Sequence, residues 1–195
     1  MKGIMSCILG VFLLTGCTQK MALTYTPIIE KQPSKQMVVS LQDFDDERQN
    51  KEEIACSRDL LYIPIYKKKS VQSPKSWISY ALESELTNAG YEVDVAGETN
   101  KYSITGKIYN LYIDYYLISS VDIKIGFSIL EEGNPVFNRI YEFKHKTPIS
   151  KAVSFDKYLQ EICKEFISDA DLFFQSASRV EIENLGTETG LSTEQ

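Results

Sequence analysis

A strict alternation of side chains in the second half of the chain constrains its fold most. In VDIKIGFSIL, residues 121–130, every second side chain from Val121 to Ile129 is large and apolar. This period of two places those side chains on one face of a β-strand. The turn EEGNP, residues 131–135, leads into a return strand, VFNRIYEFKHK, and YSITGKIYNLYIDYY precedes the pair. Together these segments predict an antiparallel sheet that is buried on one face.

Two segments with helical periodicity are suited to cover that face. The first begins with Ser73 and Pro74, a pair typical of helix N-termini, and we expect Gly90 to end it. The second spans residues 154–177. Apolar residues recur at helical spacing in both: Trp77, Ile78, Ala81, Leu82, Leu86 and Ala89 in the first, and Leu159, Ile162, Cys163, Phe166, Ala170 and Phe173 in the second. The predicted fold class is α+β, a mostly antiparallel sheet with two amphipathic helices packed on one face.

Shorter segments complete a single predicted domain, residues 36–178. We expect strands at residues 37–44 and 91–95, and a charged loop at 45–53. Residues 54–69 include the apolar patch LLYIPIY. Because Pro64 cannot donate to a sheet ladder, we expect an edge strand or an irregular segment there. Residues 179–195 are polar and acidic, which predicts a disordered tail.

The N-terminus has the organisation of a secretory signal. Residues 4–14 form a mostly apolar run after one lysine. Eleven helical residues rise about 16 Å, whereas the bilayer hydrocarbon is roughly 30 Å thick, so the run is too short for a stable transmembrane helix. It suits the apolar region of a signal peptide. The following residues, LTGC, end at Cys17 and resemble the bacterial lipobox.

The lipobox resemblance implies cleavage after residue 16 and a diacylglyceryl group on the Cys17 sulfur. An N-acyl chain on the new amino terminus follows in that family pattern, and two or more chains hold a protein stably on a membrane. An ordinary cleaved signal near Ala22 is the alternative. Thr18, in place of an aspartate, favours the outer membrane, with the domain facing the periplasm. Residues 17–35 contain two prolines and little periodicity, so we expect a tether.

Charge and cysteine content limit the partners. Without residues 1–16 the net charge is −7, which disfavours nucleic acid as a partner. Besides Cys17, the predicted mature chain holds Cys56 and Cys163. The periplasm permits a disulfide between them, yet Cys163 lies on an apolar helical stripe where a free thiol is equally at home. Both alternatives, a disulfide and two free thiols, stay open.

Part of the domain resembles the YajG-type lipoproteins of Gram-negative bacteria. The matching helix-to-strand signature comprises Ala81, Leu82, Glu85, Leu86, Gly90 and Tyr91, and the matching positions of the next strand are Ile104, Gly106, Ile108 and Asp114. The order of elements is also similar to the auxiliary lipoproteins of ABC-type lipid transport systems. The chain departs from the family in one place, where DDERQNKEEI replaces a short arginine-containing turn. The resemblance implies an envelope location and no catalytic residues.

No cluster of residues predicts catalysis or metal binding. His145 is the only histidine and lies between two lysines, whereas metal and nucleophile sites need several partners. The acidic residues at 43–47 lack the glycine and the distal glutamate of a calcium loop. We therefore expect a solvated acidic loop, no metal, no cofactor besides the lipid, and no enzymatic activity. The lysines at 67–69 are expected to form a solubilising loop.

One strand is unusually rich in tyrosine. YNLYIDYYLI, residues 109–118, carries Tyr109, Tyr112, Tyr115 and Tyr116. Either Tyr112 with Tyr116 or Tyr109 with Tyr115 could form an exposed aromatic patch, because tyrosine combines apolar area with a polar tip and suits interfaces. We consequently expect a non-enzymatic envelope lipoprotein that binds other envelope components. The alternative is an auxiliary lipoprotein of an ABC-type lipid transport system, with an apolar groove between the sheet and the Trp77 helix.

Overall fold

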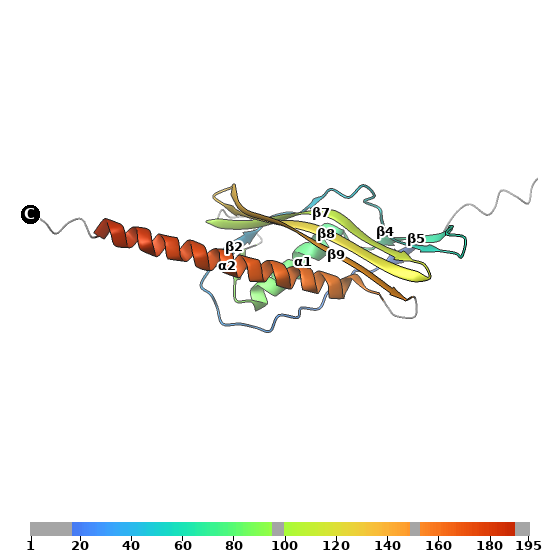
Figure 1. Cartoon of the computed structure of the whole chain (residues 1–195), viewed down its shortest axis with the longest axis horizontal. Coiled ribbons are helices and arrows are strands. Elements are labelled where there is room, and N and C mark those ends of the chain that lie inside the picture. The colour runs from blue at the N-terminus through green and yellow to red at the C-terminus, as the bar shows by residue number, and fades with distance from the viewer. Residues whose placement is uncertain (1–16, 95–99, 149–152, 190–195) are drawn as a thin grey trace, which may run out of the picture.

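The computed structural model describes residues 17–94, 100–148 and 153–189. It confirms an α+β fold in which two helices pack on one mixed sheet (Figure 1). The helices are α1 (Pro74–Asn88) and α2 (Phe155–Thr189). The strands are β1 (Cys17–Met21), β2 (Val38–Leu41), β3 (Asp45–Asp46), β4 (Glu53–Arg58), β5 (Pro64–Ser70), β6 (Glu92–Asp94), β7 (Tyr102–Tyr115), β8 (Ile118–Glu131) and β9 (Asn134–Pro148).

Strand β7 organises the sheet. Along one edge it pairs antiparallel with β8, which pairs antiparallel with β9, as the alternation predicts. Along its other edge it pairs parallel with three short strands in turn, β2, β3 and β4. The parallel pairing was not expected. It is possible because β2, β3 and β4 precede β7 and helix α1 lies between, so the chain makes the long crossover that parallel pairing requires.

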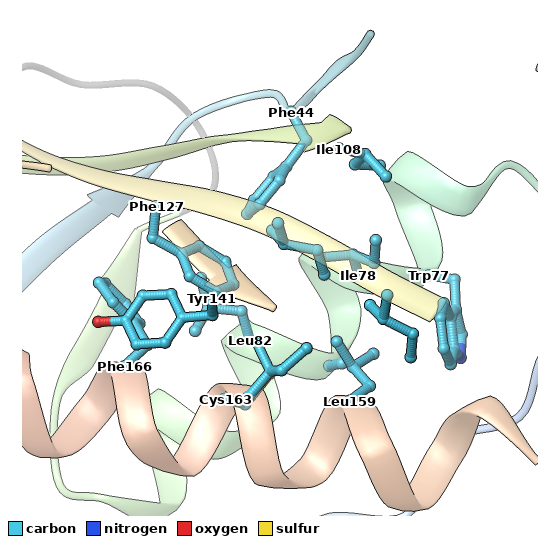
Figure 2. Packing of buried hydrophobic residues seen from close by; sticks show 14 of the residues in the cluster. Phe44, Trp77, Ile78, Leu82, Ile108, Phe127, Tyr141, Leu159, Cys163 and Phe166 are labelled. Carbon is cyan, nitrogen blue, oxygen red and sulfur yellow. The ribbon is translucent and has the colours of Figure 1, made fainter. Parts of the chain in front are cut away.

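The core lies between the sheet and the two helices. Phe127 of β8 stacks on Phe166 of α2 with ring centroids 4.5 Å apart, and Phe44 meets Phe127 edge to face at 5.8 Å. Figure 2 shows Leu159, Cys163 and Phe166 of α2 facing Leu82 and Ile78 of α1 across this layer. The apolar stripes of both predicted helices therefore meet the same sheet face.

Helix α1 begins and ends close to the predicted residues. Pro74 occupies its first turn, but the Ser73 side chain makes no capping hydrogen bond. After Asn88 the chain turns at Gly90, whose φ is +92°. A Cβ at Gly90 would lie 2.2 Å from the Pro33 carbonyl oxygen, so only glycine fits both the conformation and the space.

The expected tether at residues 17–35 is wrong, because this segment packs on the domain. Residues 17–21 form β1, and Leu23 is buried. The Trp77 indole donates a hydrogen bond of 2.9 Å to the Thr24 carbonyl, and the Gln32 amide donates to the Asn88 carbonyl. Figure 1 shows the segment, in blue, running along the helical side of the molecule.

Two other expectations need correction. Pro64 begins β5, but β5 is not an edge strand, since β1 pairs with it on one side and β4 on the other. The expected disordered tail is also wrong over residues 179–189, where α2 continues as helix to Thr189. Residues 190–195, the predicted signal peptide (residues 1–16) and Val95 lie outside the described residues.

Candidate functional site

Cys17, the predicted lipidation site, begins β1 at one end of the sheet. Its Cα is paired with that of Tyr66 in β5, and the two strands run parallel from there. The β4–β5 turn therefore lies just past Cys17, on the side from which β1 starts. Helix α2 ends at the opposite end of the long axis (Figure 1).

The same end of the sheet exposes a group of apolar side chains that we call the apolar tip. It is defined by Leu60, Leu61, Tyr62, Ile63 and Ile65 of the β4–β5 hairpin, with Leu117 and Ile118 of the β7–β8 turn. The two turns are in contact, because the Tyr116 hydroxyl donates a hydrogen bond of 3.2 Å to the Leu60 carbonyl. The sequence contains the patch LLYIPIY, but no local pattern predicts that it lies at the surface.

The four tyrosines of residues 109–116 do not form one patch. A β-bulge between Ile108 and Asn110 adds a residue, so the two-residue alternation changes phase. Tyr109 and Tyr112 consequently line one polar cavity. Tyr115 is half-buried against the core, and Tyr116 meets Tyr62 edge to face at 5.3 Å. Neither predicted pairing forms such a patch. The bulge separates Tyr109 from Tyr115, and Tyr116 lies past the end of β7, away from Tyr112.

Arg48 is the most unusual group around that cavity, whose volume is about 480 Å³. Its side chain is 3% exposed and forms a two-point contact with Asp46. Although burial opposes it, the hydrogen bonds and charge of Arg48 lower the pKa of the Asp46 carboxyl. The remaining Arg48 nitrogen, Nη1, is buried and finds no hydrogen-bond partner among the described residues. The Asp46–Arg48 pair was not predicted, because it lies within the charged loop, residues 45–53, that we expected to be solvated.

Of the two alternatives for Cys56 and Cys163, the structure shows two free thiols rather than a disulfide between them. Both are buried, but they lie on different sides of the sheet. Cys163 belongs to the core between sheet and helices, whereas Cys56 lies outside that core and beside Tyr112. Burial, then the charge of Glu85, raises the pKa of the Cys163 thiol, which disfavours the reactive thiolate form.

The remaining predicted residues have no evident chemistry. His145 is exposed in β9, its ring 5.6 Å from that of Tyr158. Lys67 and Lys69 form ion pairs with Glu53 and Glu52. Within the described ranges no three His, Cys, Asp or Glu side chains are placed to hold a metal ion. Neither helix, over the part that the structure describes, is long and apolar enough to cross a membrane.

Comparison with known proteins identifies the fold. No protein-family model matches the chain, and no curated protein matches it significantly. A Xanthomonas campestris protein of the DUF330 family superposes with a TM-score of 0.60 at 12% identity, over 83% of this chain and 99% of that one. A Neisseria meningitidis lipoprotein gives a TM-score of 0.42 at 10% identity, covering 69% and 98%.

A putative neuraminyllactose-binding hemagglutinin homolog from Helicobacter pylori gives a TM-score of 0.44 at 12% identity, over 86% of this chain and 100% of that one. The YajG-type resemblance stays a prediction, since no comparison names that family. At 12% identity the strongest of these likenesses concerns architecture alone: the chain shares its α+β fold with the DUF330 protein of Xanthomonas campestris.

Proposed function

We propose that this chain is a non-enzymatic lipoprotein of the bacterial cell envelope, anchored through Cys17, that binds or helps assemble other envelope components. The lipobox-like LTGC after a short apolar run supports the anchor. The fold shared with a DUF330 protein from a Gram-negative bacterium is compatible with it. The YajG-type resemblance supports an outer-membrane position with the domain in the periplasm.

The position of Cys17 carries the proposal. A chain that starts at Cys17 would keep β1 intact, because all five residues from Cys17 to Met21 pair with β5. The register from Cys17–Tyr66 to Met21–Ser70 then continues into the buried Leu23. A lipid on Cys17 would therefore hold the folded domain directly at the membrane surface, without a flexible tether.

An auxiliary role in ABC-type lipid transport is the second candidate. The groove expected beside Trp77 is filled, since that side chain is 3% exposed and packs against Phe155. A different cavity, of about 460 Å³, is only partly apolar, because Met37, Tyr91 and Phe174 line it together with Lys35, Asp171, Gln175, Ser178 and Arg179. Native mass spectrometry of gently extracted protein should show a co-purified lipid under this alternative, and a bare protein would count against it.

Intact mass of the membrane-extracted protein tests the anchor. We expect the mass of a chain starting at Cys17 plus its acyl groups, and loss of those groups in the Cys17→Ser variant. Crosslinking of the same sample should then yield envelope proteins as neighbours. A soluble product without lipid would contradict the proposal.

A further inference from the structure

We propose that the apolar tip inserts into the lipid leaflet that holds the acyl groups of Cys17, so the domain contacts the membrane at two adjacent points. The inference rests on the proposed lipidation of Cys17. It adds a membrane-binding surface, formed by the β4–β5 hairpin and the β7–β8 turn, that holds the domain in one orientation.

The exposure of the tip is the first observation. Leu60 and Leu61 are 77% and 79% exposed, more than any other large apolar side chain in the described residues. Leu117 and Ile118 of the neighbouring turn are also more than half exposed. A contiguous apolar patch of this kind marks a surface that another apolar phase covers.

The backbone of the turn is the second observation. The Asp59 carboxylate accepts hydrogen bonds from the amides of Leu61, at 2.9 Å, and Ile63, at 2.8 Å. The Tyr62 amide donates to the Asp59 carbonyl, and the Asp59 amide to the Ile63 carbonyl, both at 3.0 Å. The amides of Asp59, Leu61, Tyr62 and Ile63 are thus paired within the turn. Insertion into lipid requires this, because no water is available there to replace missing partners.

The turn is also held rigid with its apolar side chains outward. Tyr62 adopts a φ of +65°, an unusual value for a residue other than glycine. Its ring lies under the Arg58 guanidinium at 4.3 Å and against Tyr116. Arg58 in turn pairs with Asp114 at 3.0 Å. Because these contacts occupy Tyr62, the preceding Leu60 and Leu61 are left exposed.

The neighbouring anchor identifies the occupant as a bilayer. Paired strands lie about 4.8 Å apart, so acyl chains attached at Cys17 would start one strand spacing from Tyr66 and next to Ile65. Residues 60–63 of the tip lie beyond Ile65, on the side from which β1 and β5 start. Any lipidated copy therefore brings the leaflet, rather than a protein groove, to the tip. Tyr66 and Tyr115 flank it, as tyrosines commonly do at membrane interfaces.

Charge makes a small contribution to this contact. Of the three lysines that follow the tip, Lys67 and Lys69 are paired with glutamates, and Lys68 lies 4.5 Å over the Tyr115 ring. Apolar burial, rather than attraction to anionic headgroups, should therefore hold the tip in place. We expect insertion to persist at high salt and in vesicles without anionic lipid.

A fluorescent probe placed on the tip tests the inference. Lipidated full chain carrying Leu61→Cys is labelled with an environment-sensitive dye and reconstituted into vesicles of phosphatidylethanolamine and phosphatidylglycerol. The native thiols of Cys56 and Cys163 are buried and do not compete for the dye. We expect emission at position 61 to shift to shorter wavelength and to be quenched by spin-labelled lipid. Ile118→Cys, on the second turn, should behave in the same way.

Leu172→Cys is the matched control, since this residue is 64% exposed and belongs to α2, which runs away from the tip toward the opposite end of the long axis (Figure 1). Emission there should be neither shifted nor quenched. Equal signals at positions 61 and 172, whether both quenched or both unquenched, would overturn the inference while leaving the anchor intact. Intact mass of the same sample separates the two proposals, because a chain without lipid would overturn the proposed anchor itself.

Discussion

Glu85 shows how a single charged residue organises the N-terminal segment. It is fully buried on α1, and its carboxylate accepts hydrogen bonds from the Tyr25 hydroxyl at 2.7 Å and from the amides of Ile28 and Ile29 at 2.8 and 2.9 Å. Burial and the neighbouring Cys163 and Glu85 raise the pKa of Tyr25, which therefore stays a neutral donor. Glu85 thus attaches the segment after β1 to the domain through three hydrogen bonds.

Replacing Glu85→Ala should destabilise the fold strongly. Three donors would lose their acceptor in a buried site, so we expect the free energy of unfolding to fall by about 3 kcal/mol or more. Urea unfolding followed by circular dichroism measures it. Glu83→Ala, at a half-buried position on the same helix, should cost under about 1 kcal/mol. Equal effects for the two variants would contradict the role assigned to Glu85.

The Asp46–Arg48 pair should give stability a component that depends on pH. Since the folded state lowers the pKa of Asp46, its ionised form stabilises the fold above the ordinary aspartate pKa, and that stability is lost as pH falls through the folded value. Asp46→Asn should cost about 2 kcal/mol at pH 7, because it leaves the buried Arg48 without its counter-ion.

The cost of Asp46→Asn should shrink as pH falls below the ordinary aspartate pKa of about 4, and it should vanish below the lowered folded value, where the wild-type carboxyl is neutral too. Unfolding curves of both proteins between neutral and acidic pH measure this convergence. Asp45→Asn, at the exposed neighbouring position, is the control and should show no such trend. A cost that stays constant with pH would mean that the Asp46 charge is not what stabilises the loop.

At the scale of elements, the long β7–β8 pair determines where functional side chains point. The register is regular from Tyr102 to Ile108, and after the bulge it is regular again to Asp114. Gly106 lies in the first part of β7. There, Phe44 of the connection between β2 and β3 packs over the sheet. The missing side chain at Gly106 makes room for that ring in the core.

Gly106→Ala should therefore be destabilising by overpacking. The added Cβ would lie 2.3 Å from Phe44 Cε1 and 2.8 Å from the Gly126 carbonyl oxygen. We expect a loss of about 2 kcal/mol in unfolding free energy, measured by denaturant titration. In Gly126→Ala the nearest atom is the edge of the Tyr109 ring at 3.1 Å, which can swing aside, so this control should lose less. The opposite order would contradict the packing described.

For the whole molecule, the layered arrangement keeps its two described internal thiols apart. Cys163 lies in the core between sheet and helices, and Cys56 is in β4 outside that core. Neither thiol should react with a polar disulfide reagent in the native protein, and both should react after unfolding in urea. A reductant should leave the melting temperature unchanged. A melting temperature that falls on reduction would instead indicate a disulfide in the mature protein.

Most secondary structure could be predicted from local pattern. The alternation of β8 and the stripe from Trp77 to Leu86 are properties of residues near one another in sequence, and both elements are present. Residues 17–35 and 179–189 could not be predicted in this way. The first lacks periodicity and is ordered by partners such as Glu85, 56 or more positions away, and the second is helical despite its polar composition.

The candidate site was less predictable than the fold. The lipobox resemblance singled out Cys17, and the sequence contains the apolar run from Leu60 to Ile65, but nothing local relates the two. The parallel pairing of β1 with β5 brings them together across about fifty residues. In the same way, the bulge after Ile108, not the spacing of the tyrosines, decides that Tyr109 and Tyr112 share a cavity.

The amino-acid sequence by itself determined the α+β class, most of the strands and helices, and Cys17 as the predicted anchor, because periodicity and targeting motifs are local properties of the chain. Only the tertiary structure decided the parallel half of the sheet, the free thiols on different sides of it, and the apolar tip beside Cys17. These features depend on which distant segments pair and in which register, and the pairing free energy is shared across the whole sheet.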